Sequence, residues 1–160
     1  MISQHRFDAG LIGARARADA PCRRRRRRTG TAIVRVFSFF IPVGDPPERY
    51  RQQVIDRMGA LARIAEDCGL VLAHENEKEI YGDTPGRCAD VITAVASPAL
   101  RATFDPANFV QCGVRPHSDA YALLRPFLVY LQVKDALAAT GEVVPTVDAG
   151  LSVTVTGLTR

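Results

Sequence analysis

The sequence predicts an α/β fold of about four parallel strand–helix units within a chain of 160 residues. Three apolar runs predict this fold, because each is typical of a short buried strand that ends in polar residues: 70–76, 100–109 and 127–135. About 30 residues separate one run from the next, which is the length of one strand–helix unit. Strands that are apolar on both faces are typical of parallel sheets covered by helices.

The first unit begins with a fourth strand candidate over residues 33–42. Residues 46–69 follow as an amphipathic helix, because apolar residues recur at helical spacing. The predicted buried positions are Tyr50, Val54, Met58, Leu61 and Ala65. Pro46 and Pro47 suit the first turn of this helix, and Gly69 suits its end.

The next two units contain a clear helix and a shorter one. Thr84 is the expected cap of a helix that closes at Pro98, and its apolar face carries Cys88, Val91, Ile92 and Val95. The segment 116–127 gives a weaker helix signal, with Ser118 as the expected cap. The resulting order of strands and helices is the pattern of a parallel α/β layout.

The length sets the size of the fold. One core can be buried by 160 residues, whereas a complete eight-unit barrel needs about 250. Two architectures remain open from this reasoning, an open doubly wound sheet and part of a barrel. We expect three regions, namely a disordered Arg-rich tail at 1–31, a folded region at 32–145 and an irregular C-terminal tail at 146–160.

The basic charge is confined to the tail. Residues 1–30 carry nine arginines and two acids, a surplus of +7, whereas the rest of the chain sits at −3. The folded region therefore gives no electrostatic reason to bind nucleic acid, and only the run Arg23–Arg28 could do so. An Arg-rich sequence of this kind is also what the translation of GC-rich DNA in the wrong reading frame yields. Without a long apolar run or a signal peptide, we expect a cytoplasmic protein with no membrane contact.

The polar strand ends predict one shared site. Catalytic groups of α/β barrels sit at the carboxyl ends of the strands, so we expect Glu75, Asp105 and the segment 132–135 to converge. His74 should point away from Glu75 because side chains alternate along a strand. Asp105 precedes Pro106, so a simple turn is the alternative for that residue.

Two motifs carry a resemblance to a known family: HENEKEIYGDTP at 74–85 and FDPANF at 104–109. With the flanking segments, residues 32–145 resemble the sugar phosphate isomerase/epimerase group of the xylose isomerase-like TIM barrels. The resemblance implies a partial (β/α)8 barrel that binds a divalent metal (Mn²⁺, Mg²⁺ or Co²⁺) at its strand ends. It places Glu75 as catalytic residue and ligand, Asp105 as second ligand and Gln132 where the family usually has His. Asp148 is a poor match to the fourth ligand.

The resemblance also implies a partner, a small-molecule sugar or sugar phosphate. Asn108 and Lys134 are the candidate substrate-binding residues, although an Asx turn and a surface ion pair explain them equally well. Three functions stay open: an impaired isomerase or epimerase, an inactive truncated or frameshifted fragment, and, less favoured, a nucleic-acid-binding or endonuclease-like barrel. Unpaired strand edges predict self-association.

Overall fold

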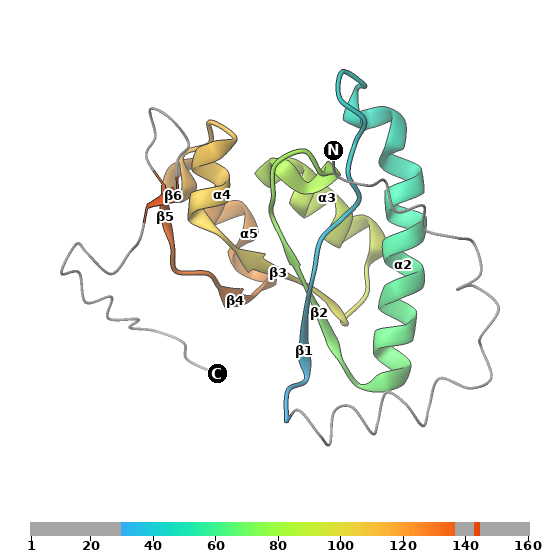
Figure 1. The fold of residues 1–160 in the computed structure, drawn as a ribbon. Coiled ribbons are helices and arrows are strands. Elements are labelled where there is room, and N and C mark those ends of the chain that lie inside the picture. The colour runs from blue at the N-terminus through green and yellow to red at the C-terminus, as the bar shows by residue number, and fades with distance from the viewer. Residues whose placement is uncertain (1–29, 137–142, 145–160) are drawn as a thin grey trace.

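Four parallel strands form the centre of the computed structural model, which describes residues 30–136 and 143–144. They are β1 (Ile33–Val36), β2 (Val71–Glu75), β3 (Leu100–Phe104) and β4 (Leu128–Leu131), paired in the order β1-β2-β3-β4 (Figure 1). Each strand thus lies beside its successor in the chain. A doubly wound sheet reverses its order at a switch point, so the architecture is that of a partial barrel.

The end of the first helix and the start of the second lie where local signals predict, whereas the first α-helix begins only after a 3₁₀ turn and the second ends at Val95, before the predicted Pro98. A 3₁₀ turn, η2 (Pro47–Tyr50), leads into α2 (Arg51–Cys68), which ends at Gly69 with a left-handed φ of 63°. Glycine adopts this conformation without the steric cost that a Cβ imposes. Helix α3 (Pro85–Val95) begins at Thr84, whose side chain accepts a hydrogen bond from the Arg87 backbone N–H.

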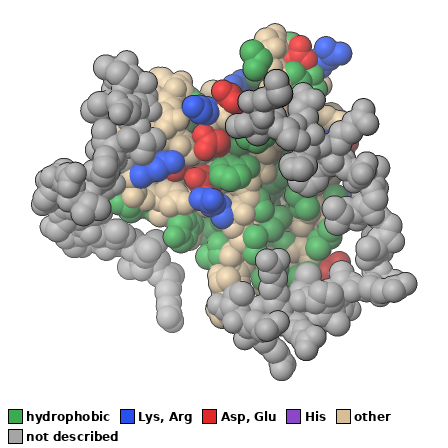
Figure 2. Space-filling model, viewed as in Figure 1, with side chains coloured by type: hydrophobic (Ala, Val, Ile, Leu, Met, Phe, Trp, Pro, Cys, Tyr) green, Lys and Arg blue, Asp and Glu red, His purple; other side chains and the backbone are tan. Residues whose placement is uncertain are grey.

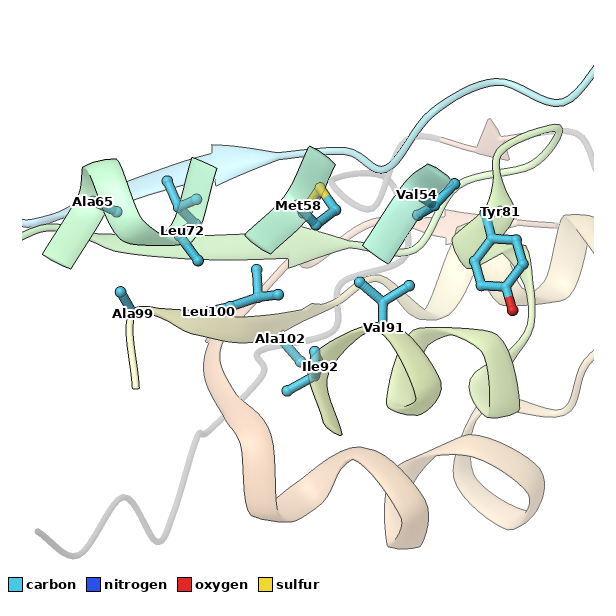
Figure 3. Close-up of a cluster of buried hydrophobic side chains, with 11 residues drawn as sticks. Val54, Met58, Ala65, Leu72, Tyr81, Val91, Ile92, Ala99, Leu100 and Ala102 are labelled. Carbon is cyan, nitrogen blue, oxygen red and sulfur yellow. The ribbon is translucent and has the colours of Figure 1, made fainter. Parts of the chain in front are cut away.

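Both helices cover one face of the sheet. Figure 3 shows side chains of α2, α3, β2 and β3 pointing toward one another in a single apolar cluster. Met58, Val91 and Leu100 are fully buried in it. One predicted core position is wrong: Leu61 is 40% exposed, and Ala62 is buried in its place. Ala62 follows Val54 and Met58 at spacings of four residues, so it continues their row on the helix surface.

The third unit differs from its prediction. Strand β3 ends at Phe104, and Asp105 caps a short helix, α4 (Pro106–Gln111), where the apolar run had suggested that the strand continues. The chain then forms the π-helix η4 (Pro116–Tyr121), α5 (Ala122–Leu124) and the 3₁₀ turn η5 (Arg125–Phe127).

Ser118 is not a helix cap. It lies inside η4, which begins at Pro116, and its hydroxyl donates a hydrogen bond to the Asp119 carboxylate. Proline favours the first position of a helix because it has no N–H to satisfy. The helix therefore begins two residues before the predicted cap.

The two outer strands are exposed, contrary to the expectation of fully buried runs. Among residues 30–136 and 143–144, strands β1 and β4 each have a neighbouring strand on one side only. Three of the four residues of β4 are exposed, and Tyr130 is 52% exposed. The run 127–135 is also not a single strand, because β4 ends at Leu131 and Asp135 opens a separate pair, β5 (Asp135–Ala136) with β6 (Val143–Val144).

The loops that follow β1 and β2 are joined through their backbones. The N–H of Ile41 donates to the carbonyl of Glu79 (2.9 Å), and the N–H of Tyr81 donates to that of Phe39 (3.0 Å). Strand β1 ends at Val36, earlier than the predicted residue 42, and residues 39–41 continue as one side of this loop pairing. Two loops at the carboxyl ends of neighbouring strands therefore form one wall.

Several predictions fall on other parts of the chain. The Arg23–Arg28 run, most of the tail at 1–31, the C-terminal tail at 146–160 and Asp148 lie outside the described residues. Within the described part, none of the helices has both the length and the apolar character needed to cross a membrane.

Candidate functional site

The site lies where the strands β2, β3 and β4 end. Glu75 is the last residue of β2, Asp105 directly follows β3, and Gln132 directly follows β4. Because all three strands are parallel, these ends meet at one edge of the sheet. The structure brings the three residues together there. Several acidic and basic side chains lie side by side near the middle of the face shown in Figure 2.

Glu75 is buried on the face of the sheet that the helices leave open. Its register neighbour is Thr103, one residue beyond Ala102, which belongs to the helix-covered core. Only 3% of the Glu75 side chain is exposed. A guanidinium N–H₂ of Arg35 lies 3.3 Å from Oε2, and the Gln132 amide donates to the same oxygen at 3.4 Å.

Burial raises the pKa of Glu75, because desolvation disfavours its charged form. The hydrogen bond from Gln132 and the charge of Arg35 act in the opposite direction. The neighbouring Asp105 carboxylate raises the pKa further. Glu75 is therefore an acid whose pKa is moved toward the range in which a carboxyl group can both accept and return a proton.

Asp105 is fully buried and divides its two oxygens between different tasks. Oδ1 accepts a hydrogen bond from the Asn108 backbone N–H at 3.0 Å and so caps α4. Oδ2 lies 2.9 Å from Nζ of Lys134 and forms an ion pair with it, but among the described residues no group makes a well-directed hydrogen bond to this oxygen. Both the turn expected at Asp105 and its place at the strand end are thus found in one residue.

Two asparagines lock the strand ends together. The Asn76 side chain donates to the carbonyl of Asp105 and accepts from its N–H, each at 2.9 Å. The Asn108 amide donates to the carbonyl of Asn76 at 2.8 Å. Asn76 was not among the sequence candidates, although a polar residue directly after a buried His-Glu pair is a signal that could have identified it.

The predicted substrate-binding residues have partners within the protein. Lys134 pairs with Asp105 and also donates to Oδ1 of Asn108 at 2.8 Å. The ion pair that the sequence left open for Lys134 is therefore present, although with a buried acid rather than at the surface. Arg35 was missed altogether. A single arginine inside the apolar run IVRVF was the available signal.

His74 lies on the opposite side of β2, as alternation predicts. It is 1% exposed, and neither ring nitrogen has a hydrogen-bond partner within the part of the chain that the structure describes. A Cβ at Gly82 would come within 2.4 Å of its ring, so the glycine is needed for close packing. Burial lowers the pKa of His74 to about 4, which keeps the ring neutral and apart from the carboxylates.

The oxygen atoms at these strand ends are of the type that a hard divalent ion binds. Such ions prefer oxygen ligands, which Glu75, Asp105 and the Gln132 amide can supply. Oδ2 of Asp105 is a buried oxygen that already pairs with a cation, the Lys134 ammonium, so its surroundings favour a positive charge at this position. The set is small, however, because no group of three or more His, Cys, Asp or Glu side chains within residues 30–136 and 143–144 is placed to hold a metal.

Comparison with known proteins identifies relatives of this fold. A family model described as xylose isomerase-like TIM barrel matches residues 22–152. The probable 3-DHS dehydratase AsbF of Bacillus anthracis superposes with a TM-score of 0.67 at 17% identity, over 87% of this chain and 49% of that one. No curated protein matches the sequence.

Two further solved structures are similar. A D-tagatose 3-epimerase-like protein has a TM-score of 0.60 at 19% identity, over 68% of this chain and 43% of that one. A xylose isomerase-like TIM barrel protein from Mycobacterium smegmatis, solved in complex with magnesium, has a TM-score of 0.57 at 22% identity, over 76% and 46%. This chain therefore spans less than half the length of each of these three relatives.

Proposed function

The chain belongs to the xylose isomerase-like TIM barrel family, and from that premise we propose that it is an isomerase- or epimerase-like protein for a sugar or sugar phosphate. The observation that supports this most directly is the pair of buried carboxylates, Glu75 and Asp105, at the ends of adjacent strands. A solved relative described as D-tagatose 3-epimerase-like supports the substrate class.

Glu75 is the proposed proton-transfer group. Aldose–ketose isomerisation and epimerisation move a proton on a carbon next to a carbonyl. Glu75 would take this proton and return it to the neighbouring carbon, which completes an isomerisation, whereas an epimerisation would also need a second donor that protonates the same carbon from the opposite face. The raised pKa of Glu75 suits it to hold the proton in between, and Arg35 beside it steadies the charged form that starts the cycle.

We further propose that Glu75, Asp105 and Gln132 hold a divalent ion, for which the magnesium complex of a relative is support. When bound, such an ion would polarise the substrate carbonyl and the adjacent hydroxyl. Asn108 and Lys134 would then face the polar groups of the sugar. Gln132 suits Mg²⁺ better than Mn²⁺ or Co²⁺, because an amide oxygen is a hard donor and a weaker ligand than imidazole.

The proposed activity is weak. The carboxylates are already paired with Arg35 and Lys134. The second carboxylate, Asp105, is held by the Asn108 backbone N–H and by the Lys134 ammonium, which leaves Glu75 as the one proposed proton-transfer acid. The alternative is an inactive protein that keeps the fold of the family without its chemistry.

Proton exchange tests the proposal directly. The 160-residue chain, incubated in D₂O with Mg²⁺ or Mn²⁺ and a panel of ketoses and their phosphates, should introduce deuterium next to the carbonyl, as seen by NMR. Glu75→Gln keeps the size of the side chain and should lower the rate by at least about 10²-fold, and chelation should abolish the exchange. Equal exchange by the chain and by Glu75→Gln would rule out Glu75 as the base, and no exchange with any substrate would favour the inactive alternative.

A further inference from the structure

We propose that the ammonium group of Lys134 is a built-in cation that occupies the oxygen atoms of Asp105 and Asn108 and so competes with a divalent ion for the site. This inference rests on the proposed metal site and adds a residue that sets its affinity. It implies that the chain would bind a divalent ion weakly even though it keeps the carboxylates of the proposed metal site.

The first support is the position of the ammonium group. Nζ of Lys134 lies 2.9 Å from Oδ2 of Asp105 and 2.8 Å from Oδ1 of Asn108. Asp105 is 0% exposed and Asn108 is 2% exposed. A buried carboxylate requires a cation nearby, and Lys134 supplies it from a side chain of which 34% is exposed.

The second support is that the oxygen atoms are held in place by other groups. Oδ1 of Asp105 is fixed by the Asn108 backbone N–H, which leaves Oδ2 facing Lys134. The amide nitrogen of Asn108 is fixed on the carbonyl of Asn76, so its oxygen must point the other way. Removing the ammonium should therefore leave both oxygens where they are, as a preformed oxygen site.

The third support is the charge balance. Glu75 and Asp105 carry two negative charges when ionised, and Arg35 and Lys134 carry two positive ones. A divalent ion approaching this balanced cluster gains little until a cation leaves. Arg35 is 54% exposed and contacts Glu75 at 3.3 Å, whereas Lys134 reaches a fully buried oxygen at a shorter distance. Lys134 is accordingly the stronger competitor.

The test is calorimetric titration of the full chain with MnCl₂ and MgCl₂ at fixed pH and ionic strength. Lys134→Met keeps an unbranched apolar side chain and removes the charge, and it should bind the ions at least ten times more tightly than the unmodified chain. Lys134→Arg keeps the charge and should not gain affinity. The only other lysine of the sequence is Lys78, which is exposed, so Lys78→Met is the matched control and should leave the affinity unchanged.

A second readout follows Lys134 itself. With two lysines in the chain, ¹³Cε labelling of lysine gives two NMR signals, which the Lys134→Arg variant assigns. Added Mg²⁺ should shift the Lys134 signal toward that of free lysine and leave the Lys78 signal in place. Circular dichroism melting of each variant establishes that it is folded. If Lys134→Met is unfolded, Lys134→Gln and the NMR titration of the unmodified chain carry the test.

The outcomes separate this inference from the proposed function. Measurable metal binding with equal affinity in the chain and in folded Lys134→Met would overturn the role of Lys134 and leave the metal site standing. A tenfold gain in Lys134→Arg as well would also overturn it, because the gain would not follow the charge. Absence of binding in all variants would overturn both the role of Lys134 and the metal site.

Discussion

The two faces of the sheet differ in what they bury, although neighbouring residues of β2 contribute to both: one face buries apolar side chains and the other buries an ionisable one. On the covered face, side chains of α2 and α3 bury Leu72 and Leu100, and His74 is enclosed as a neutral ring. On the open face, Glu75 is buried as an acid surrounded by Arg35 and Gln132. The covered face excludes charge, whereas the open face collects and balances it. Stability and chemistry are therefore separated by the alternation of a single strand.

The largest effect on stability should come from opening a cavity on the covered face. Met58→Ala removes a fully buried side chain and should lower the free energy of unfolding by about 2 to 5 kcal/mol. Leu61→Ala, on the same helix but 40% exposed, is the matched control and should cost much less. Urea denaturation gives both values, and equal losses would mean that the two faces of α2 do not differ as described.

Lowering the pH should change the contributions of His74 and Glu75 to the free energy of unfolding in opposite directions. The folded pKa of His74 is about 4 against 6.5 in the unfolded chain, so the unfolded state binds more protons between these values. Stability should fall as the pH is lowered through that window, by about 1.4 kcal/mol per pH unit at most. Glu75 acts oppositely, because its raised pKa makes the folded state bind more protons and adds stability at acid pH.

Denaturation curves of the chain and of His74→Leu at pH 7, 6, 5 and 4 isolate the contribution of His74 to the pH dependence of the free energy of unfolding. The difference in stability between the two proteins should change with pH in the direction given above. A difference that stays constant over this range would mean that His74 is not held neutral on the covered face.

A smaller effect is expected for the metal affinity of the site proposed on the open face. Gln132→His should raise the affinity for Mn²⁺ or Co²⁺ about tenfold, since imidazole is the better ligand for these ions. This corresponds to about 1.4 kcal/mol. Calorimetric titration would show it, with Mg²⁺ as the control ion that should gain less. Unchanged affinity for every ion would place Gln132 outside any metal site.

The smallest effect on stability should come from the exposed edge of the open face. We propose that the chain self-associates through β4 and its neighbours, because exposed apolar edges favour pairing. Tyr130→Ser should change the free energy of unfolding by less than about 0.5 kcal/mol and shift the chain toward the monomer. Sedimentation velocity over a range of concentrations measures this shift. A chain that is monomeric throughout would contradict the proposal.

Local signals predicted the end of α2 and the start of α3, and the strand ends predicted which candidate side chains lie close together. Gly69 ends α2 and Thr84 caps α3. Both helix ends could be predicted because a cap depends only on residues within one turn of the helix end. The positions of Glu75 and Asp105 followed from parallel strands ending at one edge. The sequence could not predict that Lys134 pairs with Asp105, because this contact depends on the path of the chain between β3 and β4.

Each of the three errors has its own physical cause. Exposure of β4 depends on what lies beside the strand in space, and an apolar run gives no sign of this. Ser118 was a reasonable cap by residue type, yet Pro116 begins the helix two residues earlier. Leu61 is more apolar than Ala62, but the row that starts at Val54 and Met58 selects the alanine for burial.

The backbone pairing between the loops after β1 and β2 has a consequence for how new binding properties could be engineered or evolve. Main-chain atoms hold residues 39–41 to 79–81, and they are the same for nearly every amino acid. Phe40, in the middle of one loop, is 71% exposed. A library randomised at Phe40 would thus vary the exposed surface of this loop over many side-chain chemistries while the paired backbone keeps its shape.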